Sequence, residues 1–339
     1  MIMKPEILFL SQENVVEAGV LDMPNVMEQV ENAYQFMGEG EVVNPAKIQL
    51  KIPEEGPWNS FFMSMPSYIK PLDVAGFKWA AESKDNVKHP GMPLGLDVVI
   101  LSDPTTVYPR AIMDGTIITA MRTSGVAGMA AKYLARKNSK VATLVGAGVI
   151  GRTMVMAIMT ALPELETIYL CDLNLPKAEA LAKEFEGKYN VIASSDTEAC
   201  AKQSDLIVTE TTCTKPFLKR EWVKDNATVI QMSGWEIDEQ IAKDAARLYV
   251  DSWAQLSHFK NSLIGHLHDN CGLERDGVVE LQDVVTGKAV GRTNDDELIC
   301  CCTLGYGAVD ITVANWIYEN AKQMGIGTKL NLWENPLWV

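Results

Sequence analysis

Hydrophobic residues recur with two different periods along this 339-residue chain, and the pattern changes near residue 141. Over residues 24–37, apolar side chains follow the period of a helix, which ends at Gly38-Glu39-Gly40. Short apolar or alternating runs follow, separated by proline, glycine and aspartate, and they predict a β-rich unit with one leading helix. These runs cover residues 47–52, 60–65, 74–81, 96–101 and 108–113.

From residue 141 onward, short apolar runs alternate with helical patterns, after a helical stretch at 116–136 and before another at 305–324. This alternation predicts an α/β fold with a Rossmann-type doubly wound parallel sheet. We expect one domain over residues 120–305. A separate N-terminal α+β domain is expected over residues 1–119, and the C-terminal helix, within residues 306–339, returns to it. Strands of the parallel sheet are expected at 141–145, 167–171, 190–193, 205–209, 227–232 and 247–250.

A glycine-rich turn follows the first of these strands and opens an apolar helix. Gly146 permits a tight turn, Gly148 lets the backbone approach a pyrophosphate, and Gly151 lets the helix pack closely on the strand. Asp172 lies just past the next strand, where a carboxylate accepts hydrogen bonds from a ribose diol. The alternative is a glycine-rich turn in some other α/β protein. We predict a dinucleotide site that contains Gly146, Gly148, Val149, Ile150, Gly151 and Asp172.

The acid also indicates which dinucleotide is bound. A carboxylate at Asp172 repels a 2′-phosphate, and no arginine follows it within residues 172–176, where an NADP site often has one. We therefore expect NAD rather than NADP as the cofactor.

Charge and cysteine usage exclude several classes of partner. The formal net charge is −14 and no block of lysine or arginine is present, so nucleic acid and anionic membranes are poor partners. The apolar run near the N-terminus is too short for a signal-peptide core. The seven cysteines form no C-x-x-C pair, which is typical of reduced thiols in a cytoplasmic protein.

Several short motifs are spread along nearly the whole chain. They are Met65-Pro66, Gly76-Phe77-Lys78, His89-Pro90-Gly91, residues 113–123, residues 146–151, Glu221-Trp222-Val223, Val250-Asp251-Ser252, residues 291–297 and Leu304-Gly305. In order and spacing, these motifs resemble those of the ornithine cyclodeaminase/mu-crystallin family. The resemblance implies the same fold, a nicotinamide cofactor and a homodimer built through the N-terminal domain. It makes residues 1–119 and 306–339 the substrate-binding and dimerisation domain, and residues 120–305 the dinucleotide-binding domain.

The same resemblance assigns roles to two charged residues. Lys78 matches the family's active-site lysine and Arg122 matches the arginine that holds the substrate carboxylate. A guanidinium binds a carboxylate through two parallel hydrogen bonds, and a partly desolvated lysine can give or take a proton. The alternatives are a water-exposed lysine at a strand edge and an arginine on a helix surface.

Further residues are assigned to the cofactor. Thr123 resembles the family's cofactor-phosphate threonine, and Thr211 with Thr212 matches the segment beside the adenosine half. Leu304 resembles the segment that closes over the nicotinamide. Ser233, after the expected strand at 227–232, is included in the same cofactor site.

Two positions depart from the cyclodeaminase pattern. Lys47 stands where the family often has arginine, and it keeps the charge for substrate binding but loses the bidentate grip. Trp235 replaces the aspartate that serves ornithine cyclisation, so we expect it beside the substrate, with packing under the cofactor as the alternative. Glu236, one residue on, is a candidate catalytic acid.

Two other clusters favour structural explanations. His266-x-His268 lacks a third metal ligand pattern, so no metal site is predicted. Cys300-Cys301-Cys302 is expected to be packed as small hydrophobic side chains.

These features predict an NAD(H)-dependent oxidoreductase that acts on a small amino or imino acid, of the amino-acid dehydrogenase or ketimine reductase type. Two alternatives stay open. One is an ammonia-eliminating lyase of the ornithine cyclodeaminase type, against which the missing aspartate counts. The other is a non-enzymatic binder of a nicotinamide or another small ligand, against which Lys78 and Arg122 count. The sequence names neither the substrate nor the direction of the reaction.

Overall fold

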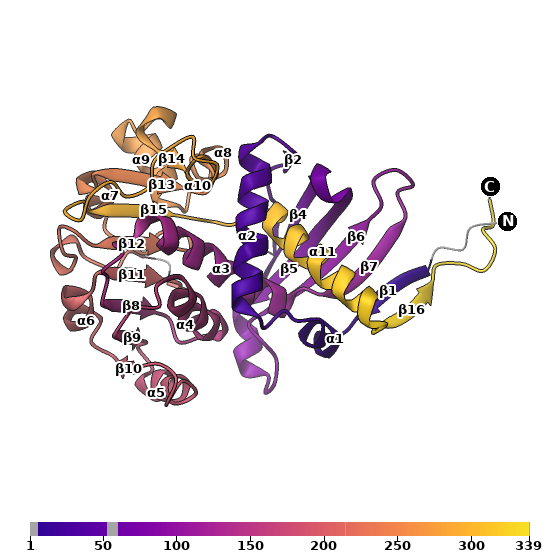
Figure 1. Ribbon diagram of the computed structural model, residues 1–339, viewed down its shortest axis with the longest axis horizontal. Helices are drawn as coiled ribbons and strands as arrows, with labels where there is room; N and C mark the ends of the chain where they lie inside the picture. Colours follow the sequence, from indigo (N-terminus) through magenta and orange to yellow (C-terminus); the bar gives the residue numbers. More distant parts are fainter. Residues whose placement is uncertain (1–5, 53–59, 214, 339) are drawn as a thin grey trace. The chain divides into compact units, whose positions relative to one another are not determined.

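The chain forms two compact units in the computed structural model, which describes residues 6–52, 60–213 and 215–338. One unit combines the chain up to Arg122 with the chain from Tyr306 onward, and the other spans Thr123–Gly305. Figure 1 shows the elements of both, coloured along the sequence. Within the described ranges, no helix is long and apolar enough to cross a membrane.

A mixed sheet forms the centre of the first unit, in the order β16-β1-β7-β6-β5-β4-β2, with β3 also paired to β4. The β-rich pattern with one leading helix predicted most of these strands, but not β1, β2 or β16. The strands are β1 (Glu6–Leu10), β2 (Val42–Val43), β3 (Ile48–Lys51), β4 (Ser60–Ile69), β5 (Val74–Ser83), β6 (Gly95–Ser102), β7 (Pro109–Asp114) and β16 (Thr328–Asn331). The helices are α1 (Gln12–Glu17), α2 (Met23–Gly38), α11 (Gly307–Met324) and the start of α3 (Thr116–Leu134).

Helix α11 covers one face of this sheet: it lies along β4, β5 and β6 and packs beside α2 (Figure 1). The approach is close at Gly76 in β5. A Cβ atom added there would lie 2.6 Å from the Ile100 carbonyl oxygen and 2.9 Å from Cδ1 of Ile311 on α11. Only glycine therefore lets the helix sit against β5 at this position, near the start of the strand.

A parallel sheet forms the second unit, in the order β10-β9-β8-β11-β12-β15-β13-β14. Counted along the chain, its first five strands have the order 3-2-1-4-5 of doubly wound dinucleotide-binding sheets, which confirms the predicted fold class. The strands are β8 (Val141–Val145), β9 (Thr167–Cys171), β10 (Val191–Ser194), β11 (Leu206–Thr209), β12 (Thr228–Gln231), β13 (Arg247–Val250), β14 (Val279–Glu280) and β15 (Ile299–Cys302). The helices are the remainder of α3 with α4 (Val149–Ala161), α5 (Leu175–Lys183), α6 (Thr197–Gln203), α7 (Glu239–Asp244), α8 (Trp253–Leu256), α9 (Leu263–Cys271) and α10 (Leu281–Val285).

The sequence pattern missed two strands of this sheet, β14 and β15. β15 lies between β12 and β13 and is buried along its whole length. It contains Cys300, Cys301 and Cys302, whose packing as small hydrophobic side chains agrees with the expectation for them. Burial raises the pKa of the Cys301 thiol well above its usual range, so this thiol is held in its neutral form.

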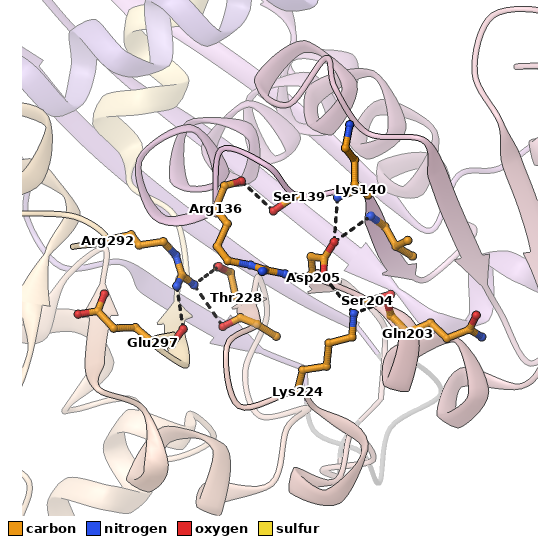
Figure 2. Close-up of polar contacts among 12 residues, drawn as sticks. Arg136, Ser139, Lys140, Gln203, Ser204, Asp205, Lys224, Thr228, Arg292 and Glu297 are labelled. Atoms are coloured by element: carbon orange, nitrogen blue, oxygen red, sulfur yellow. Dashed lines mark hydrogen bonds and ion pairs between the residues drawn. The ribbon is translucent and has the colours of Figure 1, made fainter. Parts of the chain in front are cut away.

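The amino ends of β8, β11 and β12 are tied together by a polar network (Figure 2). Asp205 accepts hydrogen bonds from Arg136, from Lys224 and from the backbone N–H groups of Lys140 and Val141. Arg292 donates to the carbonyl oxygens of Leu134 and Glu297 and to the hydroxyl of Thr228. These bonds fix the end of the sheet opposite to the one that carries the candidate site.

Candidate active site

The order of the parallel sheet reverses direction between β8 and β11, and loops at the carboxyl ends of these strands flank that point. In doubly wound sheets, ligands bind in the crevice at this reversal. The loop after β8 carries the glycine-rich turn, and the loop after β11 carries Thr211 and Thr212. The two loops are in close contact, since a Cβ added at Gly146 would lie 2.2 Å from the Glu210 carbonyl oxygen.

The three glycines of the turn differ in the space around them. A Cβ at Gly151 would lie 2.1 Å from the Gly146 carbonyl oxygen, so the start of α4 packs directly on the turn. At Gly148 the nearest atom is Nζ of Lys177, 4.0 Å away. Gly148 is the N-cap of α4 and gives it no side-chain cap, so backbone N–H groups of Val149 and Ile150 stay available to an anion. This open cradle fits a dinucleotide pyrophosphate.

Asp172 lies directly after β9, as predicted, and supports the same turn. Its Oδ2 accepts a hydrogen bond from the Ala147 backbone N–H at 2.9 Å, and its Oδ1 accepts one from the Asn174 backbone N–H at 2.8 Å. The carboxylate therefore lies at the edge of the cradle. Lys177 was not predicted from the sequence. Its ammonium lies 4.0 Å from the position that a Cβ atom on Gly148 would take, so it places a positive charge beside the turn.

Glu236 is buried and holds the loop after β11. Its Oε1 accepts hydrogen bonds from the backbone N–H of Thr211, at 2.7 Å, and from the Thr211 hydroxyl. Burial raises the pKa of Glu236. Ser233 lies after β12, three residues before this acid, and Thr212 is exposed beside Thr211. These contacts show that Glu236 fixes the loop after β11, and its role as a catalytic acid stays a prediction.

Trp235 makes packing contacts within its own unit. Its indole Nε1 donates to the Ile237 carbonyl oxygen at 3.0 Å, and its ring lies 4.4 Å from the ring of His266. It also packs against the hydrophobic core of the second unit. These contacts show how Trp235 is held, and its place beside the substrate or under the cofactor stays a prediction.

Leu304 follows β15 in a loop that an acid fixes. Oδ2 of Asp251, after β13, accepts hydrogen bonds from the backbone N–H groups of Leu304 and Gly305 at 2.7 and 2.6 Å. Thr123, on α3, is buried in the same unit. Asp251 belongs to one of the matching motifs, but the sequence did not indicate that its carboxylate binds the loop after β15.

The two histidines of the His266-x-His268 motif bind different partners. His266 pairs with Glu239 at 2.9 Å, whereas Nδ1 of His268 contacts the Leu273 carbonyl oxygen. Ligand atoms of Glu239, His266 and Cys271 do lie within 4.8 Å of one another. Lys243 already places its ammonium 2.8 Å from Glu239, which opposes a cation there.

In the first unit, Lys78 is the centre of a buried charged cluster. It lies on β5 with 1% of its surface exposed, so it is not the water-exposed lysine of the alternative. Its Nζ donates to the Thr119 hydroxyl at 3.0 Å and lies 3.0 Å from Oδ1 of Asp310 and 3.6 Å from Oδ2 of Asp97. Burial and the nearby charge of Arg122 lower the pKa of Lys78, which favours exchange of its proton.

Arg122 is held beside Lys78 by the same acid. Its Nε donates to Asp310 Oδ1 at 2.8 Å, and no residue in the described part of the chain binds its Nη atoms. Burial acts to raise the pKa of Asp310, but the charges of Arg122 and Lys78 outweigh it and lower that pKa. The guanidinium is thus fixed at one nitrogen, with two others ready for a carboxylate.

Lys47 lies just before β3 on the face of the sheet that carries Lys78. The sheet register pairs Ile48 with Ser64 and Met65 with Lys78. Continuing the β3–β4 register by one residue places Lys47 opposite Met65, about 10 Å from Lys78 across two strand spacings. Its place in a substrate site stays a prediction.

Three members of the charged cluster were given no role from the sequence: Asp97, Asp310 and Thr119, which lies in the matching segment 113–123. Asp310 gave one signal, since it is an acid in the mostly apolar first two turns of its helix. Thr119 lies three residues before Arg122, one turn along α3. Asp97 carried no recognisable pattern.

Comparisons with known proteins agree with the sequence motifs. The model of the ornithine cyclodeaminase/mu-crystallin family matches residues 6–325. The chain is 28% identical to N-((2S)-2-amino-2-carboxyethyl)-L-glutamate dehydrogenase of Staphylococcus aureus, over 98% of this chain and 100% of the relative.

Two solved structures are similar over nearly the whole chain. One is Δ1-pyrroline-2-carboxylate reductase of Thermococcus litoralis with NADH and L-proline: TM-score 0.87, 29% identity, 96% of this chain and 100% of that one. The other is an archaeal alanine dehydrogenase dimer with bound NAD: TM-score 0.86, 28% identity, 97% of this chain and 100% of that one. The predicted class of oxidoreductase agrees with all three relatives.

Proposed function

Because the chain belongs to the ornithine cyclodeaminase/mu-crystallin family, we propose that it is an NAD(H)-dependent oxidoreductase acting on a small amino or imino acid. The observation that carries this proposal is the buried pair of Lys78 and Arg122 on one carboxylate. Burying two cations is costly unless the protein uses them, and here each keeps N–H groups that a substrate could bind.

Arg122 binds the substrate carboxylate through its two Nη atoms. Its Nε is already bound to Asp310, which sets the plane of the guanidinium before substrate arrives. Lys47 adds a second positive charge on the same face of the sheet as Lys78. A substrate held in this way has its carboxylate fixed and its α-carbon oriented.

Lys78 handles the proton at the substrate nitrogen. In the reductive direction it donates a proton to the imine nitrogen, and in the oxidative direction it accepts one from the amine or from water. Burial lowers its pKa, which brings its titration closer to a working pH.

The glycine-rich turn, the first turn of α4 and Asp172 hold the cofactor, with Lys177 beside the phosphates and the Thr211 loop and Leu304 further along it. When bound, NADH supplies a hydride to the carbon of the C=N bond. Asp172 disfavours a 2′-phosphate by charge repulsion, which supports NAD over NADP.

The uncovered face of the first unit's sheet supports a homodimer. Ile48, Leu50, Trp79, Leu96 and Val98 share the face opposite to α11, and each is 39–68% exposed. Phe62 stacks on Trp79 at 5.6 Å on this face. A continuous apolar face of this kind is typical of an interface, and we propose that a second copy of the chain covers it. The seven free cysteines support the cytoplasm as the compartment.

The proposal is tested by following absorbance at 340 nm with NAD plus amino acids, and with NADH plus imino acids or 2-keto acids with amines. Net change in NADH with at least one substrate is expected. Lys78→Ala should mainly lower kcat and Arg122→Met should mainly raise KM. Lys70→Ala is a matched control, because Lys70 is an exposed lysine of the same unit.

An ammonia assay in the same cuvette with ornithine separates this proposal from the lyase. A dehydrogenase forms one NADH for each ammonia, whereas a cyclodeaminase releases ammonia and proline while 340 nm absorbance stays constant. Binding of NADH with no turnover of any substrate would instead support the non-enzymatic binder.

A further inference from the structure

The ammonium of Lys78 has three N–H groups, and only two of them have an acceptor among the described residues. Asp310 Oδ1 lies 3.0 Å away as an ion-pair partner, and Thr119 accepts one hydrogen bond at 3.0 Å. Asp97 lies 3.6 Å away, which is too far for a direct hydrogen bond. Among the residues that the structure describes, nothing accepts the remaining N–H, which is therefore the one that can reach a substrate.

The hydroxyl of Thr119 bridges the gap between Lys78 and Asp97. It accepts from Lys78 Nζ and donates its own proton to Asp97 Oδ2. An ammonium, a hydroxyl and a carboxylate thus form one continuous hydrogen-bonded chain. Each group in such a chain can pass a proton to the next when the bonds reverse direction.

Asp97 is the end of this chain nearest to solvent. It keeps 9% of its surface exposed, whereas Lys78 keeps 1% and Asp310 none. Asp310 is poorly suited to deliver protons, because its Oδ1 is shared by Lys78 and Arg122. Glu82, on β5, is an acid close enough to Asp97 for the two charges to interact.

We propose that Asp97 and Thr119 form a proton relay that recharges Lys78 after each reductive turnover, an inference that rests on the function proposed above. Lys78 gives one proton to the imine nitrogen and becomes a neutral amine. The Asp97 carboxylate then takes a proton from water and passes it to the Thr119 oxygen, while the Thr119 hydroxyl gives its own proton to Lys78 Nζ. Asp97 ends as the carboxylate that it was at the start, so one proton is consumed for each imine reduced.

A relay acts between turnovers, and this makes it separable from a structural role. In Thr119→Val, Lys78 still starts in its protonated form, so the first turnover should proceed at the wild-type rate. Later turnovers wait for Lys78 to be recharged. Stopped-flow recording of NADH oxidation should show a burst of about one NADH per site, then a steady state at least about tenfold slower than wild type.

Three further variants complete the test. Asp97→Asn should reproduce the burst and the slow phase, and Thr119→Ser, which keeps the hydroxyl, should restore the wild-type steady state. Thr312→Val is the matched control, since Thr312 is a buried threonine of the same unit whose hydroxyl has no hydrogen-bond partner in the described chain. An unchanged steady state in Thr119→Val, or a first turnover as slow as the later ones, overturns the relay.

A readout that needs no turnover is the NMR titration of Lys78 in lysine-labelled protein, assigned with Lys78→Arg. Losing the Thr119 hydroxyl or the Asp97 charge should lower the pKa of Lys78, because both stabilise its charged form. No shift in either variant refutes the hydrogen-bonded chain. Absence of turnover in the wild-type protein refutes the proposed function instead. The titration then still tests whether Lys78, Thr119 and Asp97 form the hydrogen-bonded chain.

Discussion

Lys78 and Arg122 are bound to the same atom, Oδ1 of Asp310, at 3.0 and 2.8 Å. The three side chains are 0–7% exposed, so their charges interact with little screening by water. Two cations on one oxygen repel each other, and this repulsion adds to burial in lowering the pKa of Lys78. The acid fixes the distance between the two cations.

The neighbours of Lys78 should therefore set the pH dependence of the reductive reaction. This reaction needs protonated Lys78, so kcat should fall with rising pH through a pKa below the ordinary lysine value of 10.5. Asp310→Asn removes a charge that favours the ammonium. The fall of kcat with rising pH, which is the alkaline limb of the pH profile, should therefore occur about one pH unit lower. A pH profile of kcat at saturating substrate measures the limb, and a shift to higher pH contradicts the assignment.

Gly148 and Gly151 should respond in opposite ways to alanine. Gly148→Ala meets nothing closer than 4.0 Å, so Tm should stay unchanged, but the methyl fills the phosphate cradle and should weaken NADH binding at least about tenfold. Gly151→Ala places its Cβ 2.1 Å from a backbone oxygen, so Tm should fall by about 4 °C or more. Calorimetry and fluorescence titration of NADH distinguish the two variants. A destabilised Gly148→Ala would contradict the open cradle.

Asp172 should select NADH over NADPH by at least about tenfold, because its carboxylate repels a 2′-phosphate. Asp172→Ser should narrow that ratio. It should also weaken NADH binding, since the Asp172 carboxylate supports the Ala147 N–H of the turn. Kd values for both dinucleotides check this. Equal affinities in the wild-type protein would show that Lys177 or another group accepts the extra phosphate.

Arg292 should be important for stability and not for chemistry. Its guanidinium donates hydrogen bonds to the carbonyl oxygens of Leu134 and Glu297 and to the Thr228 hydroxyl. A lysine ammonium cannot bind all three acceptors at once. Arg292→Lys should lower the free energy of unfolding by about 3 kcal/mol, because buried carbonyl groups lose their donors. Urea unfolding measures this loss, and kcat of the folded fraction should be unchanged.

The apolar sheet face should control the oligomeric state. Val98→Asp places a charge in the middle of this face and should convert the proposed dimer to a monomer, as seen by light scattering after gel filtration. Val290→Asp is the control, since Val290 is an exposed valine of the other unit. A wild-type monomer at micromolar concentration would remove the basis for the interface.

Local patterns in the sequence predicted most of the fold but only part of the charged cluster. The alternation at 74–81 gave β5 because one face of that strand is buried under α11. β15 was missed because Ile299 and three cysteines form too short a run to be distinguished from a reactive cluster. Asp310 was missed for a different reason: its contact with Arg122 joins residues 188 positions apart, and no local period records such a pairing.

The return of α11 to the first unit has a consequence for how the chain is made. During synthesis, the second unit is complete once Gly305 has emerged, while the earlier sheet still lacks its covering helix. Until Asp310 arrives, Lys78 and Arg122 have no shared counter-ion. The face of β4 and β5 that α11 later covers stays open to water or to a chaperone. The ribosome thus completes the second unit before it delivers the counter-ion that Lys78 and Arg122 share, so a chain stopped before α11 would lack both Asp310 and the helix that covers Lys78.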